Sequence, residues 1–318
     1  MAPLLSIQDL RIDFGRQTVL RGIDLEVQPG RTLGIVGESG SGKSVTALAI
    51  LGLLPEIAHV TAGRVSFDGE DLLLAGERRM RAIRGQVIGM VFQDPSGSLN
   101  PVFSIGRHVR EALLLHQRIS CRDADKRALE LLELVRIPDP RACMGRYPHE
   151  LSGGMKQRVM IAMALSCGPK LLIADEPTVA LDVTTQAQIL ALLQDLQARL
   201  GMTIVLITHD LGVMAEYADE VAVMYAGRVV ERAPTGTLFA RPAHPHTTGL
   251  LRSMPSLEEE DPAELSAIRG MAAGAGKLPP GCAFHPRCDR AFEACRDDVP
   301  PLFAVGPAHQ SACLLCRT

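Results

Sequence analysis

The sequence predicts an α/β fold, in which helices surround a largely parallel sheet, and three observations support this class. Apolar runs of strand length recur at positions 32–36, 86–92, 170–174 and 203–208. Segments whose apolar residues repeat about every 3.6 positions lie between some of these runs, as helices require. Each run ends at a glycine or a polar residue, and the carboxyl ends of parallel strands meet at one sheet edge. The pattern therefore predicts a ligand site at that edge.

Length and composition limit the class of protein. A chain of 318 residues that is 47% hydrophobic can form a substantial core and two domains. The net charge of −3 and the pI near 6.3 argue against a protein that relies on neutralising nucleic-acid phosphates. The first residues lack a signal-peptide pattern, and the apolar stretches 45–54 and 159–169 are too short to span a bilayer. We therefore expect a cytosolic chain that reaches a membrane only through a partner.

Residues 4–27 form short alternating apolar segments, with a break at Gly15 and an end at 29–30. This pattern predicts an antiparallel β segment that leads into the strand at 32–36. Phe14 is the large aromatic residue of this segment. We expect it either to stack on an adenine ring or to cap the edge of the sheet, and composition favours neither.

The stretch GESGSGKS follows the strand at 32–36 and fits the G-x-x-x-x-G-K-[ST] pattern of a phosphate loop. Backbone N–H groups of such a loop close around phosphate oxygens, and the following helix adds partial positive charge at its N-terminus. Lys43 is expected to reach the β- and γ-phosphates of ATP, and the Ser44 hydroxyl to bind Mg²⁺. The residues predicted to bind ATP here are Gly37, Ser39, Gly40, Ser41, Gly42, Lys43 and Ser44.

The next stretch predicts a hairpin strand at 63–69 and a buried strand at 86–92 that ends at Gln93. A glutamine at this position can bind Mg²⁺ and respond to the γ-phosphate, or it can simply cap the strand. From 104 to 134 the periodicity becomes helical and the charge density rises, which predicts a helical insertion between core strands.

A second phosphate-binding pattern, LSGGMKQR, starts at Leu151 and opens an apolar helix. Ser152 can bond a phosphate, and Gly153 and Gly154 let the backbone approach it. Taken alone, the same residues fit an ordinary helix N-cap followed by two glycines. Because one nucleotide does not need two phosphate loops, we expect this one to serve a nucleotide held mainly by another subunit.

The run 170–174 leads directly into two carboxylates, Asp175 and Glu176. Burying adjacent carboxylates costs several kcal/mol unless a cation or hydrogen bonds compensate. Mg²⁺ would compensate, with Asp175 holding the metal and Glu176 acting as the general base that polarises water. The run 203–208 ends at His209, which is then expected at the same sheet edge as Gln93 and Glu176.

In this order, from Leu5 to Val230, the motifs resemble those of the ATP-binding subunits of ABC transporters. The resemblance implies a RecA-like P-loop NTPase core with an antiparallel β subdomain, an inserted α-helical subdomain and a Cys-rich C-terminal extension. It also implies a role for each motif: a Walker A loop at 37–44, a Q-loop glutamine at Gln93, a signature at 151–158, a Walker B end at Asp175 and Glu176, a D-loop at Leu181 and Asp182, a switch histidine at His209, and an adenine-stacking aromatic at Phe14.

In that family two ATPase subunits pair head to tail, and ATP lies between the Walker A loop of one and the signature of the other. The resemblance therefore implies that Ser152, Gly153 and Gly154 bind ATP in trans. It implies as partners a second ATPase subunit, expected to be a paralogue, two membrane-spanning permease subunits and an extracytoplasmic solute-binding protein, and no nucleic acid. The chain would be peripheral, on the cytoplasmic face of the inner or plasma membrane.

Narrower signals are similar to the peptide and nickel importer branch of the family. They are the sequence QDPSGSLNP from Gln93, the stretch 245–251, and the cysteine-bearing tail from Leu278, which resembles the extension of dipeptide and oligopeptide transporter ATPases. The resemblance implies that ATP hydrolysis energises import of di- and oligopeptides, with nickel or another small solute as an alternative cargo. Val179 departs from the family, which usually has a hydroxyl residue there, and this puts one cross-dimer hydrogen bond in doubt.

We expect an ATP-binding domain at 1–232, with its helical subdomain at about 94–167, and a C-terminal extension at 233–318. A rival class is a soluble ABC-type ATPase that acts on nucleic acid or ribosomes. The single ATP-binding domain, the absence of a basic stripe and the importer-like tail argue against this rival.

Five of the eight cysteines crowd the end of the sequence. Cys282, Cys288, Cys295 and Cys313 are not spaced like the paired C-x-x-C motifs of common zinc ribbons. Soft thiolates in a cytosolic segment poor in regular structure indicate a metal that stabilises it. On the residues alone an iron–sulfur cluster, zinc and metal-free thiols all remain open. The resemblance implies a [4Fe–4S] cluster on these four cysteines, with Cys316 as an extra or alternative ligand.

Overall fold

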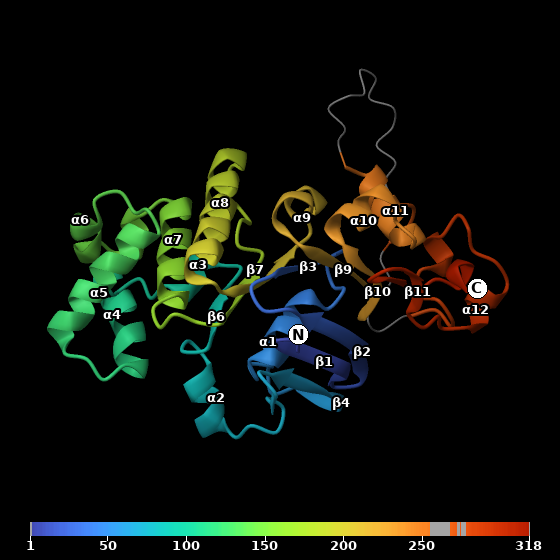
Figure 1. Cartoon of the computed structure of the whole chain (residues 1–318), viewed down its shortest axis with the longest axis horizontal. Helices are drawn as coiled ribbons and strands as arrows, with labels where there is room; N and C mark the ends of the chain where they lie inside the picture. The colour runs from blue at the N-terminus through green and yellow to red at the C-terminus, as the bar shows by residue number, and fades with distance from the viewer. Residues whose placement is uncertain (1, 255–267, 272–273, 275–277, 318) are drawn as a thin grey trace, which may run out of the picture. The chain divides into compact units, whose positions relative to one another are not determined.

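The structure is a computed structural model that describes residues 2–254, 268–271, 274 and 278–317. It divides into two compact units that alternate along the chain. Unit 1 comprises 1–28, 32–73 and 208–318, and unit 2 comprises 29–31 and 74–207. The phosphate loop therefore belongs to unit 1, whereas the signature and the Asp175–Glu176 pair belong to unit 2 (Figure 1). This division does not test the predicted boundary at 232/233, which stays a prediction.

Unit 1 contains an antiparallel sheet of four strands in the order β2-β1-β4-β5. The strands are β1 (Leu5–Phe14), β2 (Gln17–Val27), β4 (Ala58–Phe67) and β5 (Glu70–Asp71). β1 pairs with β2 on one side and with β4 on the other. Its apolar side chains at Leu5, Ile7, Leu10 and Ile12 are all buried, which is what short alternating segments predict. The antiparallel segment expected at 4–27 and the hairpin strand expected at 63–69 are both confirmed.

A second sheet carries the phosphate loop of unit 1. Its strands there run in the order β11-β12-β10-β9-β3. They are β3 (Thr32–Gly37), β9 (Glu220–Tyr225), β10 (Arg228–Pro234), β11 (Phe303–Gly306) and β12 (His309–Ser311). β3 is buried along its whole length and runs parallel to β9. The C-terminal extension thus contributes two strands to the sheet of the phosphate loop, which the sequence did not predict.

Helices and 3₁₀ turns complete unit 1. They are α1 (Lys43–Ile50), α9 (Leu211–Tyr217), α10 (Thr235–Ala240), α11 (Pro245–Arg252), α12 (Ala294–Asp297), η2 (His285–Arg287) and η3 (Leu314–Cys316). α1 begins at Lys43, directly after the loop, as expected.

Unit 2 contains the parallel strands in the order β8-β7-β6. They are β6 (Ile88–Val91), β7 (Leu171–Asp175) and β8 (Thr203–Thr208). Val91 pairs with Ala174, and Asp175 pairs with Ile207, so the carboxyl ends of the three strands lie at one edge. Burial is complete along β7 and β8, as continuous apolar runs predict for a parallel sheet covered on both faces.

The helical insertion predicted between β6 and β7 is confirmed. Besides α2 (Glu77–Ile83), the helices of unit 2 are α3 (Pro95–Ser98), α4 (Ile105–His116), α5 (Cys121–Leu134), α6 (Pro140–Gly145), η1 (Pro148–Glu150), α7 (Gly153–Ala164) and α8 (Val183–Leu200). α4, α5 and α6 pack against one another (Figure 1). Ser104 and Ser120 cap the amino ends of α4 and α5 with their side-chain oxygens. Among the described residues, no helix combines the length and the apolar character that crossing a membrane requires.

Candidate functional site

The phosphate loop joins the buried strand β3 to helix α1. Lys43 is only 7% exposed, and its Nζ donates to the carbonyl oxygens of Gly37 at 2.8 Å and Glu38 at 3.1 Å. Gly40 and Gly42 have φ of +77° and +102°, a left-handed backbone that glycine adopts without steric cost. The loop thus holds the ammonium group against its own carbonyls, where phosphate oxygens could accept the same protons.

The other predicted loop residues point to the same use. Ser41 is buried, and its Oγ makes no hydrogen bond within the described residues. A Cβ at Gly37 would overlap the carbonyl oxygen of Met224 on β9, so the backbone there needs glycine. Ser44 is the second residue of α1, next to the positive end of the helix dipole. These features suit a loop whose backbone and hydroxyl groups bind an anion.

Phe14 ends β1 and is half-buried, with Gln17 of β2 and Ala58 of β4 as its strand partners. A ring at the end of a strand fits both adenine stacking and closure of the sheet edge. Both interpretations stay predictions.

The acidic pair of unit 2 lies at the carboxyl edge of its parallel strands. Asp175 is the last residue of β7 and is 5% exposed. Glu176 has φ of +48°, which is uncommon for a residue with a side chain, and its N–H donates to the Ile207 oxygen at 2.8 Å. Gln93 is exposed and follows the end of β6 by two residues, so it belongs to the same edge. Non-glycine residues held in sparsely populated conformations cluster at functional sites.

The second phosphate pattern begins helix α7. The Ser152 Oγ accepts a hydrogen bond from the Met155 N–H at 3.4 Å, which is the N-cap that the alternative interpretation predicts. Ser152 and Gly153 are both exposed, so a phosphate could also reach them. A Cβ at Gly154 would lie 2.6 Å from Cγ2 of Thr185 on α8. The cap is therefore present, while binding of a nucleotide in trans stays a prediction.

His209 directly follows β8 and is exposed. The next residue, Asp210, caps α9 by accepting from the N–H groups of Gly212 at 2.7 Å and Val213 at 3.3 Å. His209 belongs to unit 1 with the phosphate loop, whereas Gln93 and Glu176 belong to unit 2. The predicted residues therefore form one group in each unit.

Sequence reasoning missed one residue of the phosphate loop, Glu38. Its carboxylate accepts from Nη1 of Arg287 at 2.8 and 3.0 Å, and Nε2 of His246 lies 3.5 Å from Oε1. Both partners come from the C-terminal extension, and Arg287 is 249 positions away along the chain. The only available signal was an acidic residue inside a loop that binds anions.

The surroundings keep Glu38 ionised. The contact with His246 and then the Arg287 guanidinium lower the pKa of Glu38 to about 2, against burial, which raises it. His246 is fully buried, and burial lowers its own pKa, so we take the imidazole as neutral at pH 7. Glu38 therefore carries a negative charge throughout the physiological pH range, beside a loop predicted to bind a polyanion.

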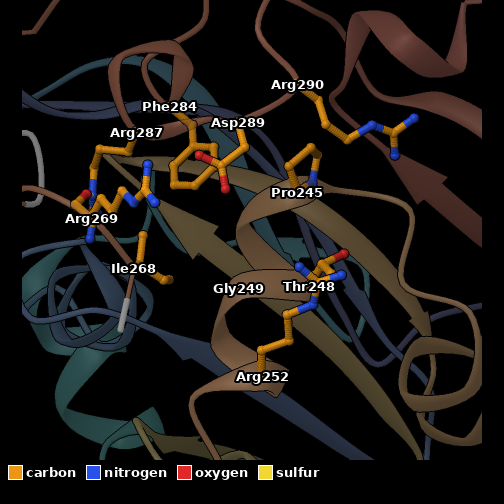
Figure 2. A pocket seen from close by; sticks show the side chains of 10 residues that line it. All are labelled: Pro245, Thr248, Gly249, Arg252, Ile268, Arg269, Phe284, Arg287, Asp289 and Arg290. Atoms are coloured by element: carbon orange, nitrogen blue, oxygen red, sulfur yellow. The ribbon is translucent and has the colours of Figure 1, made fainter. Parts of the chain in front are cut away.

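Arg287 also lines a cavity of about 280 Å³ (Figure 2). Helix α11 lines it together with residues 268–269 and 284–290. Figure 2 shows Arg287 and Arg269 next to each other and Asp289 among the lining side chains. The charged residues of its lining are Arg252, Arg269, Arg287, Asp289 and Arg290.

The structure does not support the predicted cluster site in the tail. In the part of the chain that the structure describes, no group of three or more His, Cys, Asp or Glu side chains is arranged to hold a metal ion. Burial raises the pKa of Cys282 and Cys288 and raises that of Cys313 to about 11, so as placed these thiols are protonated. Two of the four cysteine segments nevertheless meet, since the Cys282 N–H donates to the Cys295 carbonyl oxygen at 2.9 Å. The donor set suits a soft metal, but its geometry does not.

Two protein-family profiles match the chain. The family described as "ABC transporter" matches residues 20–179, and the one described as "Oligopeptide/dipeptide transporter, C-terminal region" matches residues 230–295. A probable peptide ABC transporter ATP-binding protein of Sinorhizobium fredii is 51% identical over 315 residues, which are 98% of this chain and 94% of the relative. The oligopeptide transport ATP-binding protein OppD of Bacillus subtilis is 50% identical over 311 residues, which are 96% of this chain and 87% of the relative.

Solved structures of ATP-binding cassettes share the fold. A dimeric cassette in a post-hydrolysis state, bound to ADP and Pi, is 30% identical with a TM-score of 0.65, and the match covers 73% of this chain and 98% of the cassette. A subunit from Clostridium perfringens that is part of the ABC transporter complex cbiONQ is 30% identical with a TM-score of 0.66, over 76% of this chain and 92% of that subunit.

Proposed function

The chain belongs to the ABC transporter family, and from that membership we propose that it is the ATP-binding and ATP-hydrolysing subunit that energises import of di- and oligopeptides. Its core is the RecA-like P-loop NTPase fold, and its reaction converts ATP and water to ADP and phosphate. The observation that carries the choice of cargo is that one chain combines the ABC profile with the oligopeptide and dipeptide transporter C-terminal region.

The phosphate loop accounts for ATP binding in this proposal. Its backbone N–H groups and Lys43 bind the phosphates. On ATP binding, the Lys43 ammonium exchanges its hydrogen bonds to the loop carbonyls for hydrogen bonds to phosphate oxygens. Phe14 supplies the adenine-stacking surface. Ser152, Gly153 and Gly154 bind in trans the ATP that the second ATPase subunit holds, and the signature of that subunit completes the site of this one.

Hydrolysis depends on the residues that follow the strands. Ser44, Gln93 and Asp175 offer hydroxyl, amide and carboxylate oxygens, which are ligands that Mg²⁺ prefers. When bound, Mg²⁺ neutralises charge on the β- and γ-phosphates. Glu176 accepts a proton from the attacking water as general base, and His209 and Gln93 orient the reacting groups. Glu176 has an uncommon backbone conformation, with φ of +48°. Because such conformations cost energy and persist mainly at functional sites, this supports a catalytic role in which the carboxylate keeps a fixed orientation.

The assembly is the second part of the proposal. The subunit pairs head to tail with a second ATPase, a paralogue, and both act on two permease subunits that receive cargo from an extracytoplasmic solute-binding protein. Residues 1–232 form the ATPase domain and 233–318 the extension, on the cytoplasmic face of the membrane. ATP binding closes the pair of ATPases, hydrolysis reopens it, and the region after Gln93 passes this motion to the permeases.

An uptake experiment tests function and cargo together. A strain that lacks this gene is complemented with the wild type or with Glu176→Gln and is offered labelled di- and oligopeptides in parallel with Ni²⁺. We expect loss of peptide uptake that only the wild type restores. Loss of nickel uptake alone would retain the ATPase and contradict the peptide cargo, and unchanged uptake of both would contradict the importer.

We also propose that Cys282, Cys288, Cys295 and Cys313 bind a [4Fe–4S] cluster, with Cys316 as an alternative ligand. The proposal needs the four thiols to deprotonate and draw together, since metal binding releases protons from its ligands. Iron, labile sulfide and visible charge-transfer absorbance in anaerobically purified protein would support it. Zinc in the same sample, or no metal at all, would contradict it.

A further inference from the structure

The contact between Glu38 and Arg287 joins the phosphate loop to the C-terminal extension. We propose that Arg287 is a positioning residue of the ATP site: it holds and neutralises Glu38, so that the extension becomes part of the nucleotide-binding machinery. The inference rests on the proposed function only in that the loop at 37–44 binds ATP. It adds a residue from a segment to which neither the sequence motifs nor the profile matches assign such a role.

Arg287 is fixed before it meets Glu38. It ends the short turn η2, its side chain is only 8% exposed, and its Nε donates to the Arg269 carbonyl at 3.0 Å. Nη1 also lies 3.4 Å from the Tyr225 hydroxyl. Tyr225 is the last residue of β9, the strand that runs parallel to β3. The guanidinium is therefore anchored to the same sheet that delivers the phosphate loop, and its direction is set by several acceptors.

Glu38 connects this anchor to the lysine that binds phosphate. Its carboxylate accepts from Arg287, while its carbonyl oxygen accepts from Lys43 Nζ at 3.1 Å and from the Ser41 N–H at 3.2 Å. When Lys43 turns toward the phosphates, that carbonyl loses one of its donors. The side-chain contact with Arg287 then keeps Glu38 in place while the lysine moves.

Charge gives the second reason for this arrangement. An ionised carboxylate in a loop that binds ATP repels the phosphates, because like charges at short range disfavour each other. Arg287 approaches that carboxylate with Nη1 at 2.8 and 3.0 Å from its two oxygens. It offsets this repulsion with a charge-assisted contact that is strong because it is partly buried. Without the guanidinium, the loop would face ATP with an uncompensated negative charge.

An aromatic layer closes the other side of Glu38. His246 is fully buried with Nε2 3.5 Å from Oε1 of Glu38, and its ring lies 4.7 Å from that of Tyr225 and 5.2 Å from that of Phe284. Phe284 lies in the same segment as Arg287 and meets Tyr225 edge to face at 5.3 Å. The Glu38 carboxylate therefore sits between the extension and the core of unit 1, where small movements of the extension reach the phosphate loop.

The first experiment compares two arginines of the same segment. Arg287→Gln is matched with Arg290→Gln, because Arg290 lines the same cavity and is exposed. We expect Arg287→Gln to raise the Kd for ATP by about 5- to 50-fold, within the usual range of coupling between sites. Arg287→Lys should recover part of this loss, and Arg290→Gln should bind like the wild type. Turnover at saturating ATP should change by less than about twofold, which separates positioning from chemistry.

A double-mutant cycle then tests the mechanism. If Arg287 acts by holding and neutralising the Glu38 carboxylate, removing that carboxylate removes the reason for the loss, so the double variant Glu38→Gln/Arg287→Gln binds ATP no more weakly than Arg287→Gln alone. Thermal unfolding of the nucleotide-free proteins, within a few degrees of wild type, shows that the change is local. Should Arg287→Gln fail to fold, Arg287→Lys and the double variant Glu38→Gln/Arg287→Lys carry the same comparison.

The outcomes separate this inference from the function on which it rests. A wild type that does not bind ATP contradicts the proposed function. A wild type that binds ATP, with Arg287→Gln within twofold of Arg290→Gln, overturns the positioning role and leaves the ATPase intact. Strictly additive losses in the double variant also overturn it, because they would mean that the two residues act independently.

Discussion

At the scale of single residues, Glu176 is the most sharply defined chemical prediction. A general base typically contributes between about 10²- and 10⁴-fold to a rate. We therefore expect Glu176→Gln to keep ATP binding and to lower turnover by about this factor, measured as phosphate release under saturating ATP. The exposed Glu133 of α5 provides the matched control, since Glu133→Gln removes the same charge from unit 2. Wild-type turnover in Glu176→Gln would show that another group activates the water.

Lys43 gives the complementary prediction at this scale. Its ammonium donates hydrogen bonds to the carbonyls of Gly37 and Glu38, and we expect it to donate to phosphate oxygens instead when ATP binds. We expect Lys43→Ala to lose ATP affinity itself, by at least about tenfold, since a hydrogen bond to a charged group contributes about 1.5–3 kcal/mol. Equilibrium binding of a fluorescent ATP analogue measures the effect. Equal affinity in the variant, with only turnover reduced, would contradict a ground-state role for the lysine.

Glu38 makes stability depend on pH in acid. Its pKa is about 2 in the folded protein, against an ordinary value of 4.5. A carboxyl whose folded pKa is depressed stabilises the fold above its unfolded pKa and loses that contribution as pH falls toward the folded pKa. We expect wild type to lose up to about 1 kcal/mol of this contribution between pH 6 and pH 4. Urea unfolding of wild type and Glu38→Gln across this interval checks it, and a constant difference between them would contradict it.

The residue scale also shows what local pattern can and cannot predict. The place of Lys43 and Ser44 at the start of α1 was predictable because a phosphate loop is a contiguous pattern that follows a buried strand. Arg287 was not, because its partner lies 249 positions away and no periodicity relates the two. The spacing of the cysteines likewise did not predict their positions in space, and among the described residues the thiols are not arranged as ligands of one metal ion.

At the scale of elements, the start of α7 packs closely against α8. A Cβ at Gly154 would lie 2.6 Å from Cγ2 of Thr185, whose Oγ1 donates to Asp182 at 2.7 Å. We expect Gly154→Ala to destabilise unit 2 by about 1–3 kcal/mol through overpacking. Thr185→Ser removes the methyl group and keeps the hydroxyl, so the double variant should recover most of the loss in urea unfolding.

The control for this contact is Gly145→Ala, because nothing lies within 4 Å of a Cβ built there. It should cost less than about 1 kcal/mol, or stabilise slightly by restricting the unfolded chain. If Thr185→Ser fails to rescue Gly154→Ala, the loss does not come from the contact with the Thr185 methyl group.

Element prediction succeeded where burial was uniform. The apolar run 203–208 corresponds residue for residue to β8, and 32–36 forms β3 with one further glycine. β11 and β12 escaped prediction because they span only four and three residues and gain their hydrogen bonds from β10 and from each other. Their existence depends on tertiary context, which short runs of sequence do not contain.

At the scale of the whole molecule, the extension adds strands to the sheet of unit 1 and also stabilises that sheet. Glu231 of β10 is fully buried and accepts from the N–H groups of Ala243 at 2.6 Å and His244 at 2.9 Å. Nε2 of His309 on β12 lies 2.8 Å from the same carboxylate. A buried carboxylate requires such partners, because leaving it without one costs several kcal/mol. The end of the chain therefore supports the sheet from which the phosphate loop emerges.

This dependence predicts the behaviour of a shortened chain. Ending the chain at residue 302 removes β11 and β12, uncovers the edge of β10 and takes His309 away from Glu231. We expect a loss of about 3–5 kcal/mol, the usual cost of removing the partner of a buried carboxylate, measured by urea unfolding without nucleotide. A chain that ends at Cys316 keeps both strands and should unfold like the full protein. His309→Gln, which retains a hydrogen-bond donor, should lie between the two. Equal urea midpoints for the chains ending at 302 and 316 would mean that the extension folds onto the core without stabilising it. The sheet that carries the phosphate loop would then be stable without β11 and β12.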